Sequence, residues 1–161
     1  MKLHILTAFT LATLATAQSP EKAHVMKVPA VLLAPDDMKY MAAPPATGMP
    51  SAVQMTVLSG DPGKPGLFAI RLKIPAGGKI AAHWHPTDEN LTVLEGTFAA
   101  GMGDKFDESA MKEFPAGSFL TLPKRMNHFA MAKGDTVLQI HAMGPFVLNY
   151  VNPADDPRKA K

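Results

Sequence analysis

The most informative part of this sequence is the run Gly77-Gly-Lys-Ile-Ala-Ala-His83-Trp-His85-Pro-Thr-Asp-Glu89, which continues through Leu94-Glu95 to Gly96. Side chains alternate between the two faces of a β-strand, so His83 and His85 point the same way, about 7 Å apart. A turn after His85 can return Glu89 on a neighbouring strand, level with the two histidines. Three side chains of these types at one point are what a divalent metal ion requires.

Short apolar runs alternate with turn residues on both sides of this stretch, which is typical of an all-β sandwich or barrel. Between Phe68 and Ile74 every second residue is large and apolar, and this pattern predicts a strand with one buried face. We predict strands at 53–57, 68–74, 80–85, 91–94, 97–100, 119–122, 128–132, 136–141 and 146–151. Only the stretch 104–112 favours a helix, a short one capped by Asp104.

The composition is that of a globular domain with many turns. The chain has 161 residues, 47% hydrophobic and 19% charged, with 15 prolines and 12 glycines. This length allows one domain with a substantial core but hardly two. The 16 basic residues nearly balance the 14 acidic ones, and they form no basic block. The sequence therefore argues against nucleic acid as a partner.

The N-terminus has the pattern of an export signal. Lys2 precedes an apolar run over residues 3–15, and Ala15-Thr16-Ala17 is a small-x-small cleavage site. The run is too short to cross a bilayer as a helix. We expect residues 1–17 to be a signal peptide cleaved near Ala17, giving a periplasmic or secreted protein without a membrane span. The sequence has no cysteine, which excludes thiol catalysis and zinc–thiolate sites.

The rest of the chain divides into three parts by composition. Residues 18–51 are rich in Pro, Ala and Met, and we expect them to form an N-terminal arm packed on the barrel. One or two edge strands are expected in it, formed by Val25, Val28, Val31, Leu32 and Leu33. Residues 52–152 carry the strand patterns and form the single β domain. Residues 153–161 are charged and are expected to be a flexible tail.

The second half of the chain supplies a fourth candidate ligand, and with it a family resemblance. The pattern Gly77-x5-His83-x-His85-x3-Glu89-x6-Gly96 is similar to the first motif of the cupin superfamily at every fixed position. The segment Gly117-x5-Pro123-x4-His128 resembles the second motif in its glycine, proline and histidine. The chain looks like a small, single-domain secreted cupin, and the resemblance covers residues 53–151.

The resemblance implies a cupin jelly-roll β-barrel with a metal ion inside, held by His83, His85, Glu89 and His128. Three imidazoles and one carboxylate suit Fe, Mn, Ni, Cu or Zn better than Mg or Ca. Strand parity places further side chains at the pocket. We expect these to line it or to support its ligands by hydrogen bonds: Leu91, Val93, Ala130 and His141.

The second motif departs from the family pattern at two positions. Arg125 stands where a turn glycine is common, which puts the geometry of that turn in question. Ala132 stands where the family often has asparagine, which suggests a less polar pocket. Neither departure removes a ligand.

Two classes of function fit these residues. The first is a metal-dependent enzyme acting on a small organic, anionic molecule, as a dioxygenase or as a metal-assisted isomerase or lyase, with Glu89 as a ligand or a general base. The alternative is a non-catalytic, metal-stabilised module that binds or senses a small ligand. The arm, Trp84 and the habit of the family favour a homodimer.

Overall fold

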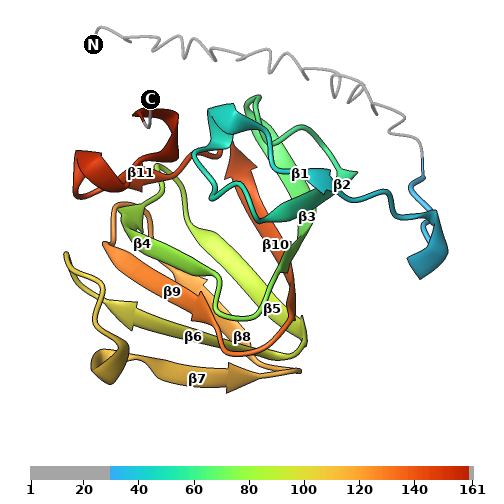
Figure 1. Ribbon diagram of the computed structural model, residues 1–161. Coiled ribbons are helices and arrows are strands. Elements are labelled where there is room, and N and C mark those ends of the chain that lie inside the picture. Colours follow the sequence, from blue (N-terminus) through green and yellow to red (C-terminus); the bar gives the residue numbers. More distant parts are fainter. Residues whose placement is uncertain (1–29, 160–161) are drawn as a thin grey trace, which may run out of the picture. The chain divides into compact units, whose positions relative to one another are not determined.

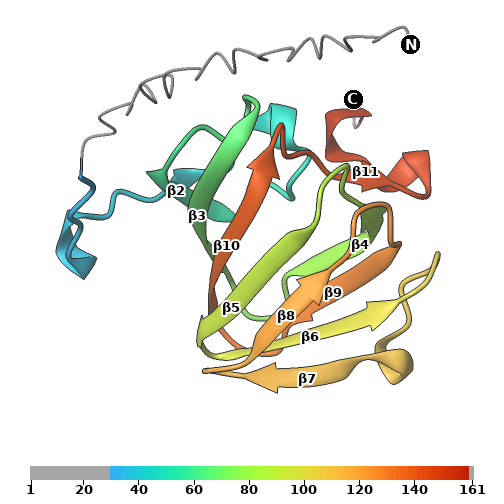
Figure 2. The same ribbon diagram turned by 180° about the vertical axis from the view of Figure 1, so that it is seen from behind.

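Two antiparallel β-sheets make up the structure, a computed structural model that describes residues 30–159. The predicted signal peptide and the first part of the predicted arm lie outside the described residues, and the compact unit that contains both sheets begins at Val31. Figure 1 shows the two sheets facing each other, and Figure 2 shows them from behind. Within residues 30–159, no helix is long and apolar enough to cross a membrane.

Non-consecutive strands lie side by side in both sheets, which is the winding of a jelly roll. The first sheet has the order β1-β2-β3-β10-β5-β8, formed by β1 (Met41–Ala42), β2 (Gln54–Ser59), β3 (Gly66–Ile74), β10 (Thr136–Gly144), β5 (Glu89–Glu95) and β8 (Phe119–Leu122). The second has the order β11-β4-β9-β6-β7, formed by β11 (Asn149–Tyr150), β4 (Lys79–Trp84), β9 (His128–Ala132), β6 (Thr97–Met102) and β7 (Lys112–Pro115).

The apolar faces of the sheets enclose one core. In β3, Phe68, Ile70, Leu72 and Ile74 are buried while the residues between them are more exposed, as the period of two predicts. β10 pairs with β3 on one side and with β5 on the other, so it contributes Leu138 and Ile140 to the centre of this core. The prediction of an all-β cupin jelly roll is confirmed, although strand pairing does not close the described sheets into one barrel.

The predicted short helix at 104–112 is wrong. The structure has only a 3-10 turn there, η3 (Glu108–Ala110), whose cap is Asp107 rather than Asp104. The Asp107 carboxylate accepts hydrogen bonds from the backbone N–H and the hydroxyl of Ser109, at 2.9 and 2.6 Å. The chain leaves the turn at once because Lys112 already pairs with Ala100 as the start of β7. These local hydrogen bonds take the place of those that a longer helix would form.

In the described part of the predicted arm, the residues that contact the core are not the ones we expected. Leu32 is 88% exposed, and Val31 and Leu33 are also exposed and outside any strand. The edge strand is instead β1, which pairs with β2. After β1 the segment 43–53 contains one 3-10 turn, η2 (Pro45–Thr47), and buries Ala43, Met49 and Val53. This segment lacks strand pairing, because its prolines remove the N–H donors a ladder requires.

Residues 153–159, expected as part of a flexible tail, make specific contacts. They form the 3-10 turns η4 (Pro153–Asp155) and η5 (Pro157–Lys159). The Arg158 guanidinium donates to both carboxylate oxygens of Asp156, at 2.7 and 2.9 Å, and to the carbonyl oxygen of Leu148 at 2.8 Å. The C-terminal end of the described chain is thereby attached to the segment that follows β10.

Two glycines of the first motif give a matched test of the fold. Gly77 and Gly96 both have φ of 75°, but a Cβ at Gly77 would meet open space, whereas a Cβ at Gly96 would collide with the carbonyl oxygen of Asp135. We expect Gly77→Ala to cost about 1–2 kcal/mol of unfolding free energy, the penalty of the left-handed conformation. Gly96→Ala should cost at least roughly 1 kcal/mol more because the backbone must also shift. Urea denaturation in the presence of a chelator measures both, and equal losses would contradict the close approach at Gly96.

Candidate metal centre

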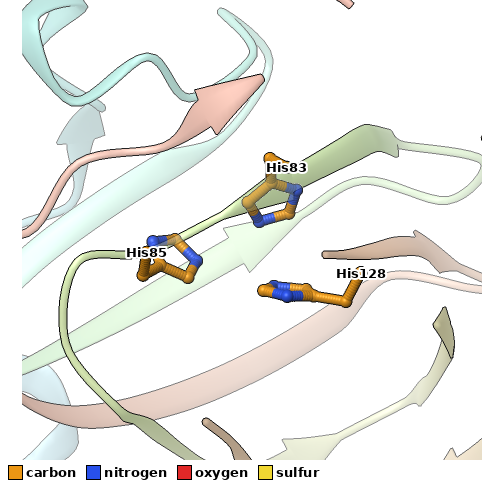
Figure 3. A group of neighbouring side chains, drawn as sticks. All are labelled: His83, His85 and His128. Carbon is orange, nitrogen blue, oxygen red and sulfur yellow. The ribbon is translucent and has the colours of Figure 1, made fainter. Parts of the chain in front are cut away.

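Three histidines meet between the two sheets. His83 lies near the end of β4, His85 follows β4 by one residue, and His128 begins β9. His83 and His128 occupy paired positions of the β4–β9 ladder. One ring nitrogen from each of the three lies within 4.8 Å of the others, and Figure 3 shows the rings turned toward a common point. The described residues therefore contain a three-histidine group that can hold a metal ion.

Backbone carbonyl groups orient all three rings in the same way. The Nδ1 atoms of His83, His85 and His128 lie 2.7, 3.0 and 2.9 Å from the carbonyl oxygens of Ala81, Val147 and Met126. A carbonyl oxygen can only accept, so each Nδ1 must carry the proton and donate it. Each Nε2 then keeps its lone pair and is available to a cation. The three histidines therefore fit a metal ion both in the distances between their nitrogens and in their protonation.

Glu89 brings the fourth predicted ligand from the opposite sheet. It is the first residue of β5, and its Oε2 atom lies 3.4 Å from Nε2 of His85 and 3.7 Å from Nε2 of His128. The exposed fractions of His83, His85, Glu89 and His128 are only 3, 3, 5 and 3%. The structure thus brings together four predicted ligands that come from both sheets and from two distant parts of the chain.

Burial keeps these four groups uncharged when no cation is bound. Burial, reinforced by the neighbouring imidazole of His128, lowers the pKa of His85 to about 3. Burial likewise lowers the pKa of His83 and His128, and it raises the pKa of Glu89 to about 8. At neutral pH the contact between His85 and Glu89 therefore joins two neutral groups and is no ion pair. A bound cation reverses the effect on Glu89, because a nearby positive charge favours the carboxylate.

Only some of the residues predicted to line or support the pocket lie at the cavity. Leu91 and Ala130 lie on the wall of the cavity that contains the four candidate ligands, whereas Val93 is buried in the core outside that wall. The prediction for His141 has to be corrected. Its side chain is exposed on the opposite face of β10 from Leu138 and Ile140, so it cannot reach the histidines.

Several cavity residues were not predicted from the sequence, among them three that lie outside the strands. The ring of Phe146 stacks on that of His85, with centroids 4.3 Å apart and planes 12° apart. Leu148 and Met49 also line the cavity. Phe146, Leu148 and Tyr150 are large residues at every second position, and this alternation could have predicted that Phe146 and Leu148 point inward. Met49 lies in an irregular segment where no period exists.

The two departures in the second motif are accommodated differently. Arg125 takes the conformation that glycine would supply, with φ of 61°, and its N–H donates to the carbonyl oxygen of His85 at 2.9 Å. The turn survives at a cost of about 1–2 kcal/mol for a left-handed residue with a Cβ. Ala132 is fully buried but lies outside the cavity wall, so its lack of polarity does not affect the lining.

The chain is similar to known proteins in both sequence and fold. The chain is 32% identical over 72 residues to the auxin-binding protein ABP19b of Prunus persica, a match that covers 44% of this chain and 34% of that protein. Thus only about a third of that curated relative is matched.

Solved structures with low sequence identity share the fold. The polyketide cyclase RemF from Streptomyces resistomycificus has a TM-score of 0.62 at 17% identity, covering 80% of this chain and 89% of that one. An RmlC-like cupin from Shewanella frigidimarina has a TM-score of 0.55 at 16% identity, covering 73% and 94%.

The family comparison covers most of the described structure. Residues 29–147, more than half of the chain, match the family described as the ChrR cupin-like domain. This range contains all four candidate ligands and both sheets except β11. The chain therefore belongs to the ChrR cupin-like family of the cupin superfamily.

Proposed function

We propose that this cupin is an enzyme that holds one divalent transition-metal ion through His83, His85, Glu89 and His128 and acts on a small, anionic organic molecule. The observation that carries the proposal is the convergence of three Nδ1-anchored imidazoles and one carboxylate, all buried, in a mostly apolar cavity. Four buried polar side chains at one point are costly unless a charge or a hydrogen bond compensates them. A cation offers that compensation.

The donor set narrows the metal and the type of ligand. Three neutral nitrogen donors and one oxygen donor suit Fe, Mn, Ni, Cu or Zn. A divalent ion with a single carboxylate retains a net positive charge, so an anionic oxygen of a substrate is attracted to any open coordination position. A bound ion of this kind supplies either Lewis-acid polarisation of a carbonyl or enolate oxygen, or dioxygen chemistry if it is iron.

The chain's own residues contribute the orientation of the ligands and a candidate general base. The carbonyl oxygens of Ala81, Val147 and Met126 hold the imidazoles in one tautomer, which keeps their Nε2 atoms directed into the cavity. Glu89 can also serve as a general base when it does not bind the ion. Dioxygenase and isomerase or lyase reactions are both compatible with these roles.

A non-catalytic binding or sensing module is the second candidate. It is favoured by the cavity lining, which within the described residues offers no titratable side chain apart from the four candidate ligands. Catalysis would depend wholly on the ion and Glu89. The cupin fold serves both kinds of protein, so the fold cannot distinguish them.

The metal site is tested with a matched pair of histidine variants. We expect the purified wild-type protein to bind one ion, and His83→Ala to weaken binding at least about 100-fold, because losing a ligand should exceed the effect of losing a ligand's hydrogen-bond partner. His141→Ala should bind like the wild type because His141 lies on the exposed face of β10. Metal analysis after dialysis and chelator competition measure both. A wild type with little metal, unaffected by His83→Ala, would contradict the proposal.

Proton release on metal binding tests the electrostatics of the site. At pH 7 the buried histidines are already neutral, whereas Glu89, with its pKa raised to about 8, is mostly protonated. Binding should therefore release about one proton per ion, from Glu89, and the release should fall as the pH rises above 8. Glu89→Gln should release almost none. Calorimetric titrations in buffers of different ionisation enthalpy measure the number, and an equal release by the wild type and Glu89→Gln would contradict Glu89 as the source.

Turnover separates the two candidate functions. Protein reconstituted with Fe(II), Mn(II), Ni(II) or Zn(II) is incubated aerobically with a broad set of small organic acids, and mass spectrometry monitors the products. We expect conversion of at least one compound by the wild type and His141→Ala, and none by His83→Ala. Retention of one compound without any product would favour the binding module instead.

A further inference from the structure

The cavity around the candidate metal centre is small for an organic substrate. It leaves about 30 Å³ to the centres of water-sized spheres. Since one water needs about 10–15 Å³, the cavity has room for only about two or three water molecules. The four candidate ligands are all at least nine-tenths buried, so a larger molecule can reach them only if part of the wall yields.

Most of the wall is formed by residues that cannot move easily. Leu72, Leu91, Leu138 and Ile140 stand on β3, β5 and β10, which are paired with neighbouring strands on both sides. Phe146 is held against the ring of His85. Displacing any of these side chains would disturb either the sheet or the candidate ligands.

Met49, like Phe146 and Leu148, is a wall residue outside the strands, and of these three it has the most flexible side chain. It is only 6% exposed and lines the cavity, yet it belongs to the segment 43–53, which lacks strand pairing. Its unbranched side chain has three rotatable bonds and a soft thioether, so it adapts to a neighbour more readily than a branched residue. It also follows Gly48, whose φ of 75° marks a turn of the backbone just before it.

Contacts with the C-terminal part set the position of Met49. The Leu148 N–H donates to the carbonyl oxygen of Thr47 at 2.9 Å, and the Tyr150 hydroxyl donates to the carbonyl oxygen of Gly48 at 2.9 Å. A Cβ on Gly48 would lie 3.0 Å from Cζ of Arg158, so the guanidinium would have to shift to admit any other residue there. Figures 1 and 2 both show this cyan stretch and the red C-terminal stretch at the same end of the sheets.

We propose that Met49 is a specificity-determining residue, which limits by its size the molecules that can occupy the cavity beside the candidate metal centre. This inference rests on the proposed function, because it concerns what the bound ion can accept. The substrate class that follows is a small carboxylate or comparable oxyanion, whose body fits beside Met49 rather than in its place.

The test uses Co(II)-loaded protein, whose visible absorption changes when the ligands of the ion change. Formate, acetate, propionate and benzoate present the same donor group on successively larger bodies, and each is titrated into the wild type, Met49→Ala and Met41→Ala. Met41 is the matched control, since it lies in the same N-terminal part on β1 but is 72% exposed. Met49→Val is a milder variant for the case that Met49→Ala does not fold, which thermal melting and bound Co(II) establish.

We expect the wild type and Met41→Ala to bind formate best and benzoate worst. Met49→Ala should reduce the preference for formate over benzoate by at least about tenfold through a gain in benzoate affinity, with a smaller gain in Met49→Val. The inference is overturned if the wild type binds all four acids equally, or if the Met49 variants keep its preference. Wild-type protein that takes up no Co(II) would instead contradict the proposed function, so the two failures are distinguishable.

Discussion

The burial of four polar side chains at the meeting point of two sheets is the constraint on which this structure depends. His83, His85 and His128 come from one sheet and its loops, and Glu89 comes from the other. Burial without a nearby opposite charge favours the neutral form of each group, and it shifts the pKa values of His85 and Glu89 accordingly. The arrangement is stable only because backbone carbonyl oxygens satisfy the Nδ1 atoms, and because the carboxyl of Glu89 can remain protonated until a cation arrives.

The same hydrogen bonds connect the candidate centre to the segments around it. Val147 accepts from His85, and its neighbour Leu148 both lines the cavity and donates to Thr47. Residues far apart in the sequence therefore bear on the orientation of one imidazole and on the space beside it. A small molecule in the cavity would contact both the oriented ligands and the residues that limit its size. We therefore relate the proposed chemistry and the proposed size limit to the same cavity.

Regular patterns made much of the fold predictable. The bounds of β8 and β9 coincide with the predicted strands 119–122 and 128–132, because their apolar residues line a buried interior. β7 was missed because three of its four residues are exposed, and an exposed edge strand leaves no periodic apolar face. The predicted helix at 104–112 failed for a related reason. The backbone of this nine-residue stretch forms its hydrogen bonds through a single 3-10 turn and a strand. Helix propensity alone does not distinguish that arrangement from a short helix.

By itself, the sequence determined which side chains are candidate ligands and which of them share a strand face, since motif spacing and the period of two are local properties. The tertiary structure decided the rest. It put His141 on the exposed face of β10, gave each Nδ1 a carbonyl partner and brought Met49 into the cavity wall. Each of these outcomes depends on which sheet face packs inward or on contacts between distant segments. No local pattern encodes such contacts, because they arise only when the two sheets close on a common core.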